Sequence, residues 1–167
     1  MPPVAQIEYN LLALLPEIAL LIGACIVLLV DALGRDDADP LVDRVALFVL
    51  LLPLVAIFYV AGQGHAYAFG DMYVADLMAH TLKVCAIIAT GTVIIYSRQY
   101  LLDRDMRRGE IYSLALFSLL GQMVMMSGSN LLVLYLGLEL MALSTYALAA
   151  MRRGSARASE AGIKYFV

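Results

Sequence analysis

The feature that most restricts the fold of this sequence is a series of long apolar runs joined by short polar connections. A run of roughly 18 or more apolar residues is typical of a membrane-spanning segment. We predict spans at residues 11–33, 43–62, 76–96, 111–128 and 130–150, and the start of a sixth at residues 159–167. Within a bilayer only helices and closed barrels satisfy their own backbone polar groups, and these lengths suit helices. The sequence therefore predicts an all-α fold, a polytopic transmembrane helical bundle that forms a single membrane domain over residues 1–167.

The composition agrees with a membrane protein and limits the chemistry of the chain. Hydrophobic residues make up 63% of the sequence and charged residues 15%, whereas soluble domains have about 25% charged residues. The two cysteines, Cys25 and Cys85, lie in separate apolar runs, and an iron–sulfur cluster needs about four. No G-x-G-x-x-G dinucleotide-binding motif follows a strand. We therefore expect no metal site, no redox cofactor and no direct NADH binding in this chain.

Arginines gather in alternate connections and so predict the orientation of the spans. The first, third and fifth connections, with the adjacent span ends, contain all of them: Arg35, Arg44, Arg98, Arg104, Arg107, Arg108, Arg152, Arg153 and Arg157. The N-terminal tail and the second and fourth connections contain no Lys or Arg. Short connections that carry Lys and Arg remain in the cytoplasm. We therefore predict that the odd-numbered connections are cytoplasmic and that the N-terminus lies outside.

Four ionisable residues fall within the apolar runs, namely Glu17, Lys83, Glu139 and Lys164. A charge at the centre of a bilayer costs about 2.5–3.5 kcal/mol on insertion scales. Such residues usually face the interior of a bundle, pair with one another or mark an ion path. These four are therefore the candidate functional residues.

Glu139 is the principal candidate. It lies nine residues after Asn130 and so about 13 Å along its helix, near the middle of the membrane. Tyr135, Ala142 and Tyr146 fall on the same helical face, so two phenols accompany the carboxylate. We interpret Glu139 as a titratable group in a proton path. The alternative is a protonated glutamate that forms a structural hydrogen bond to a neighbouring helix.

Lys83 and Glu17 lie nearer the outer ends of their spans. Lys83 is about 10 Å into its helix and shares a face with His80 and Asp76. We interpret Lys83 as an anchor or as the ion-pair partner of Asp76, and a part in proton translocation is the weaker alternative. Glu17, which follows Pro16, is interpreted as a polar contact between helices.

Lys164 is a further candidate, in the partial sixth span. Glu160 precedes it by four residues, a spacing at which opposite charges pair on the surface of a helix. Two interpretations stay open, this intrahelical pairing and participation in a proton path.

Several stretches of the sequence resemble a known family. "YLGLELMALSTYALAA" followed by "SEAGIKYFV" is similar to the signature of the fifth and sixth helices in the antiporter-like membrane subunits of respiratory complex I, the NADH–quinone oxidoreductase. "LLPEIALLIGACIVLLVD" and "GEIYSLALFSLLGQMVMMSGSNLLVLYLGLEL" also resemble that family. The element E-A-x-x-K-Y-F favours the subunit N branch over its sister subunits M and L. The similarity extends over most of the chain.

The resemblance implies a protein of about fourteen helices with two inverted repeats, a general transporter pattern. Glu139 matches a fifth-helix glutamate that lies beside a lysine of the seventh helix, and Lys164 matches a sixth-helix lysine. The partner lysine would then lie beyond Val167, and the sequence would correspond to the N-terminal portion, about a third, of such a subunit.

The resemblance also implies a function. The chain would be a membrane-arm subunit that contributes to proton translocation coupled to electron transfer from NADH to quinone. NADH, FMN, iron–sulfur clusters and quinone would bind to other subunits. The expected partners are other membrane subunits of complex I and the lipid bilayer, and no nucleic acid. Arg-rich, Lys-poor usage favours a bacterial inner membrane, with the mitochondrial inner membrane as the alternative.

Two other functions remain open. One is a subunit of an Mrp-type cation/proton antiporter, which shares the fold. The other is a structural or assembly piece that does not conduct protons.

Overall fold

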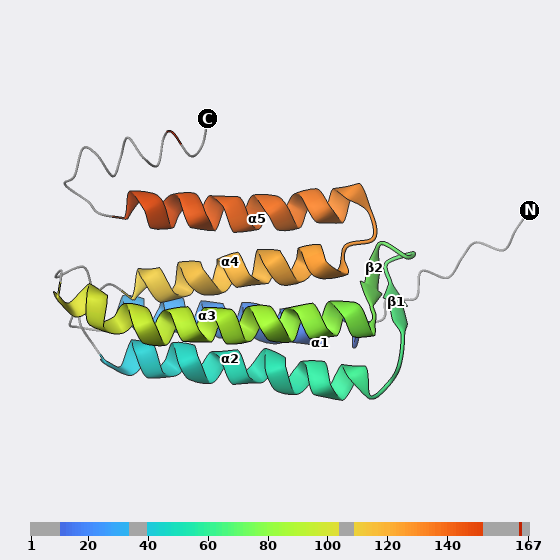
Figure 1. The fold of residues 1–167 in the computed structure, drawn as a ribbon, viewed down its shortest axis with the longest axis horizontal. Helices are drawn as coiled ribbons and strands as arrows, with labels where there is room; N and C mark the ends of the chain where they lie inside the picture. Colours follow the sequence, from blue (N-terminus) through green and yellow to red (C-terminus); the bar gives the residue numbers. More distant parts are fainter. Residues whose placement is uncertain (1–10, 34–39, 104–108, 152–163, 165–167) are drawn as a thin grey trace, which may run out of the picture.

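The computed structural model describes residues 11–33, 40–103, 109–151 and 164, and long helices make up most of it (Figure 1). The helices are α1 (Leu15–Leu33), α2 (Pro40–Ala61), α3 (Leu77–Asp103), α4 (Glu110–Ser127) and α5 (Leu131–Ala150). All five are long and apolar enough to cross a membrane. The predicted bundle of transmembrane helices is thus confirmed, and the protein is an integral membrane protein.

The helix ends differ from the predicted span ends by a few residues. Helix α1 begins at Leu15, because the four residues before it form turns. Helix α2 begins at Pro40 rather than at residue 43, in agreement with the preference for proline in the first turn of a helix. Helix α3 continues through a polar stretch beyond Tyr96 to Asp103. The sixth span lies outside the described residues except for Lys164, which is helical.

A β-hairpin, which the sequence analysis did not predict, lies in the second connection. Strands β1 (Ala66–Ala68) and β2 (Tyr73–Ala75) pair antiparallel. The turn between them places Gly70 at φ 63°, in the left-handed region that glycine adopts without steric cost. The backbone N–H of Ser129 donates to the carbonyl of Met72 at 3.0 Å. The hairpin is therefore fastened to the connection between α4 and α5.

The main buried core lies between α1, α2, α3 and α4. Residues with no exposed surface there are Leu20, Ala24, Val27, Ala46, Leu116, Leu119 and Met123. Large apolar side chains also cover outward faces of the helices, including Phe48, Val55, Phe58 and Ile95. Hydrocarbon is a suitable surrounding for such faces, whereas water is not, because apolar surface is driven out of water.

Helix α5 lies alongside α4 (Figure 1), and one glycine on each helix lies at their contact. A Cβ atom on Gly121 would lie 2.6 Å from both the carbonyl oxygen of Gly137 and the backbone nitrogen of Met141. A Cβ atom on Gly137 would lie 2.8 Å from the carbonyl oxygen of Gly121. Small residues let membrane helices approach to backbone contact. These glycines therefore fix the position of α5, the helix that carries Glu139.

The bundle has two distinct ends. We call the end at which β1 and β2 lie the hairpin end; α1, α3 and α5 all begin there (Figure 1). We call the opposite end the basic end, because Arg98 lies there. The Nε atom of Arg98, on α3, lies 3.0 Å from Oδ2 of Asp43, which is buried in the first turn of α2. This ion pair joins α2 and α3 at the basic end.

Candidate functional site

Glu139 lies near the middle of α5, as the sequence predicted. The helix is capped at the hairpin end by Asn130, whose side-chain oxygen accepts a hydrogen bond from the backbone N–H of Leu132 at 3.1 Å. This arrangement satisfies one of the free N–H groups of the first turn. Glu139 follows nine residues later, about 13 Å along the helix axis. Its side chain is half-buried.

Glu139 occupies the face of α5 opposite to α4. Gly137, which contacts α4, precedes it by two residues, and two residues turn an α-helix by about 200°. The hydroxyl of Tyr135, one turn nearer the hairpin end, lies close enough to interact with the Glu139 carboxylate. Tyr135 is 59% exposed. Glu139 and Tyr135 thus face away from the other four helices.

The other members of this face complete the local chemistry. Ala142 and Tyr146 also lie on it, and both are half-buried. Within the described residues, Glu139 has no ion-pair partner. The carboxylate therefore stands beside a phenol on a surface that the described helices do not cover. Such a group can exchange a proton or pair with a basic side chain from elsewhere.

The second candidate for a proton path is Lys164, the one residue of the predicted sixth span that the structure describes. It is helical and exposed, and its predicted partner Glu160 lies outside the described residues. The structure therefore leaves both interpretations of Lys164 open.

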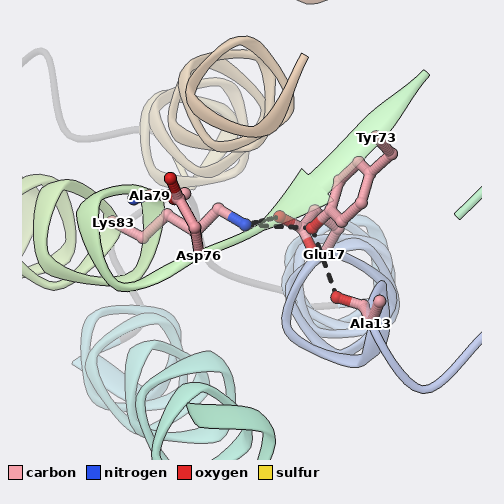
Figure 2. Close-up of polar contacts among 6 residues, drawn as sticks. All are labelled: Ala13, Glu17, Tyr73, Asp76, Ala79 and Lys83. Carbon is pink, nitrogen blue, oxygen red and sulfur yellow. Dashed lines mark hydrogen bonds and ion pairs between the residues drawn. The ribbon is translucent and has the colours of Figure 1, made fainter. Parts of the chain in front are cut away.

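Lys83 has a different partner from the one that the sequence suggested. Figure 2 shows its side chain reaching from α3 to Glu17 on α1 and to Tyr73 on β2. The Nζ atom lies 2.6 Å from Oε1 of Glu17 and donates to the hydroxyl of Tyr73 at 2.9 Å. The side chain of Lys83 is fully buried and that of Glu17 is 6% exposed. Two of the four candidate residues therefore form one buried ion pair at the hairpin end.

Asp76 does not pair with Lys83, because it caps α3. Its Oδ1 accepts the backbone N–H of Ala79 at 2.7 Å, the geometry of an N-cap residue. The sequence-based prediction started the helix at residue 76 and therefore counted Asp76 as part of the face that carries Lys83. In the structure Asp76 precedes the helix and caps it. Lys83 therefore has a structural contact, but its ion-pair partner is Glu17 and not Asp76.

Tyr73 is a member of this cluster that the sequence analysis missed. Its hydroxyl donates to the carbonyl of Ala13 at 3.3 Å, and its ring centre lies 5.1 Å from Nζ of Lys83, within the range of a cation–π contact. Burial raises the pKa of the Tyr73 phenol well above its usual range, and the charge of Glu17 raises it further. The phenol is therefore held in its neutral form.

One signal in the sequence could have identified the Glu17–Lys83 pair. Glu17 is six residues into the first predicted span and Lys83 is seven residues into the third. Both spans begin on the same side of the membrane, so both charges lie about 10 Å deep. Opposite charges at equal depth in parallel helices are candidates for pairing. The contact that Tyr73 of the hairpin makes with Ala13, just before α1, has no such signal.

The described residues offer little to a metal ion. No group of three His, Cys, Asp or Glu side chains in that part of the chain is arranged to hold one. Cys25 and Cys85 are both exposed and unpaired.

Comparison with known proteins identifies the family. The family model "NADH:quinone oxidoreductase/Mrp antiporter, TM" matches residues 128–167. The NADH-quinone oxidoreductase subunit N of Herminiimonas arsenicoxydans is 47% identical over 163 residues, which cover 95% of this chain and 33% of that protein.

Two further relatives carry the same name. The protein of Polaromonas naphthalenivorans is 47% identical over 93% of this chain and 32% of its own length. That of Thioalkalivibrio sulfidiphilus is 39% identical over 95% of this chain and 33% of its own length. By sequence, this chain belongs to the NADH-quinone oxidoreductase subunit N family and spans about a third of the length of the curated relatives that it matches.

Proposed function

We propose that this chain is part of a membrane-arm subunit of a proton-pumping NADH–quinone oxidoreductase, and that it contributes to proton translocation. The names of its relatives support the assignment to that complex. The observation that carries the proton role is the position of Glu139, a carboxylate at mid-helix on a face that the described helices leave uncovered. NADH, FMN, the iron–sulfur clusters and quinone would bind to other subunits.

Glu139 is the proposed proton-carrying group. In an apolar surrounding its charged form needs a basic partner, and we place that partner on a helix beyond Val167. Tyr135 remains a suitable neighbour in either charge state, because its hydroxyl can donate to a carboxylate or accept from a carboxylic acid. Moving one charge through the membrane potential involves about 2.3 kcal/mol per 100 mV. A charge pair whose separation changes with turnover is suited to that task.

Lys164 is proposed as a second member of the same path. The family model that covers both Glu139 and Lys164 supports this role. The charge of the side chain is the property that matters, so an arginine at this position should serve nearly as well as lysine.

The orientation and the membrane are also proposals. The arginine distribution supports a cytoplasmic basic end and an external hairpin end. The bacterial sources of the relatives support the inner membrane of a bacterium. Other membrane subunits of the complex and the lipid bilayer are the proposed partners.

The Mrp-type antiporter is the second candidate function, because the matching family model covers both classes. Affinity purification of the tagged full-length subunit from its own membranes separates the two. We expect flavin- and iron–sulfur-containing subunits to copurify, together with NADH oxidation. Copurification with antiporter subunits that lack flavin and iron–sulfur centres would overturn the assignment to the oxidoreductase.

A further inference from the structure

The buried charges at the hairpin end have no place in the function proposed for Glu139. Glu17 and Lys83 form an ion pair with almost no exposed surface. The free energy needed to remove two charges from water exceeds the attraction between them unless further hydrogen bonds satisfy both groups. Lys83 has such a bond, to Tyr73. Among the described residues, neither carboxylate oxygen of Glu17 has a hydrogen-bond partner besides the ion pair itself.

His80 lies near Lys83, and both of its ring nitrogens are unsatisfied. It is 5% exposed, and neither Nδ1 nor Nε2 finds a hydrogen-bond partner in the described part of the chain. It precedes Lys83 by three residues on α3, a spacing that brings side chains together on one helical face. The charges of Lys83 and of Asp76 both act on it. Buried polar atoms of this kind are commonly satisfied by internal water.

The cap residue Asp76 and the α3 residues His80 and Lys83 form a line that leads inward from the hairpin end. Asp76 caps the helix, His80 follows one turn later, and Lys83 lies nearly one turn deeper. Asp76 is partly exposed, whereas Lys83 is fully buried. The line therefore connects the surface at the hairpin end to the buried pair.

We propose that Glu17, Lys83 and His80 form a proton-exchange site at the hairpin end, in which His80 links the buried pair to the surface. A proton from the surface binds one ring nitrogen of neutral His80, and the imidazolium releases a proton from its other nitrogen through bridging water to the carboxylate of Glu17. Glu17 becomes a neutral acid and His80 a neutral imidazole again. The reverse steps return the proton. Lys83 remains an ammonium and holds Glu17 charged between these events.

The surroundings of the site favour proton exchange by these groups alone. The nearby titratable side chains are Tyr73 from β2, which burial holds neutral, and the capping carboxylate of Asp76. Helix α4 contributes the buried hydroxyl of Ser127. Within the described residues, α2 contributes at this end only Tyr59, which is 59% exposed.

The inference deepens the proposed function, because a proton site at the hairpin end is useful where protons cross the membrane. Its test is independent of pumping. Infrared difference spectra of the purified complex are recorded after a downward pH jump, and the carbonyl band of a protonated carboxylic acid is followed in time. We expect such a band in the wild-type complex, its loss in Glu17→Gln, and at least about tenfold slower appearance in His80→Gln, since general acid–base transfer by a histidine contributes that much or more.

The matched control is Asp43→Asn, which removes the other buried carboxylate that pairs with a cation. Asp43 lies at the basic end, away from the proposed site, and its partner Arg98 cannot be deprotonated and so has no proton to exchange. This variant should therefore leave both the band and its rate unchanged. Identical spectra for the wild type and Glu17→Gln would overturn the site. A band that depends on Glu17 but appears at the wild-type rate in His80→Gln would overturn the role of His80. If Glu139→Gln does not alter pumping, the proposed function of Glu139 is overturned. The infrared result alone then decides whether the site at the hairpin end exchanges protons.

Discussion

The contact between Gly121 and Gly137 predicts a measurable cost for one added methyl group. In Gly121→Ala the new Cβ would lie 2.6 Å from two backbone atoms of α5. Ordinary contact begins at 3.4 Å, so α4 and α5 must separate by roughly 0.8 Å or bend. Overpacking of this kind costs about 1–3 kcal/mol. We therefore expect Gly121→Ala to lower the free energy of unfolding by that amount.

Gly91→Ala is the matched control for this experiment. Its added Cβ would lie 3.5 Å from Cδ1 of Leu50, and alanine is favoured over glycine inside a helix by up to about 1 kcal/mol. The chain has no Trp, so unfolding is best followed by circular dichroism during a denaturant titration in detergent micelles. Equal stability of Gly121→Ala and Gly91→Ala would refute the close approach of the two helices.

Three further outcomes follow from the hairpin end and the orientation. An impermeant thiol reagent applied to intact cells should label a cysteine placed at Ser129 and not one placed at Arg153, and the reverse pattern would contradict the proposed orientation. Lys83→Met should lower the free energy of unfolding by about 3–5 kcal/mol, because it leaves Glu17 buried and unpaired. The double variant Glu17→Gln/Lys83→Met should recover most of that loss, and equal losses in both variants would contradict the pairing. The free energy of unfolding should fall as the pH rises above about 10, the pKa of an unfolded tyrosine, because the raised pKa keeps Tyr73 neutral only in the folded state. If Tyr73→Phe loses as much stability at alkaline pH as the wild type, this cause is contradicted.

The sequence predicted the helices well because the bilayer itself sets their length. An apolar run such as that of α5 has to be about twenty residues long to cross the hydrocarbon core, and the carboxylate of Glu139 stands out within it. The end of α3 was less predictable. The residues from Ser97 to Asp103 are polar enough to leave the bilayer, yet nothing in them breaks a helix, so α3 continues.

The partners of the charges were beyond the reach of the sequence. Membrane helices are apolar on nearly every side, so periodicity does not tell which face meets which neighbour. Lys83 could therefore be assigned to Asp76 on its own helix, although Glu17 on α1 is the partner. The hairpin was missed for a related reason. Its strands have three residues each, and its position depends on tertiary contacts of Tyr73 with Ala13 and Gly128.

The proton role of Glu139 is tested most directly by Glu139→Gln in the assembled complex. Glutamine retains the size and hydrogen bonding of glutamate but cannot exchange a proton at physiological pH. Proton ejection per NADH oxidised is measured in sealed vesicles, with Ser144→Ala as control. Ser144 lies buried on the same helix, and its hydroxyl donates to the carbonyl of Leu140 one turn earlier in that helix. We predict that Glu139→Gln assembles and ejects fewer protons per NADH, while Ser144→Ala behaves as the wild type. A Glu139→Gln complex that pumps at the wild-type ratio would reduce Glu139 to a structural hydrogen bond.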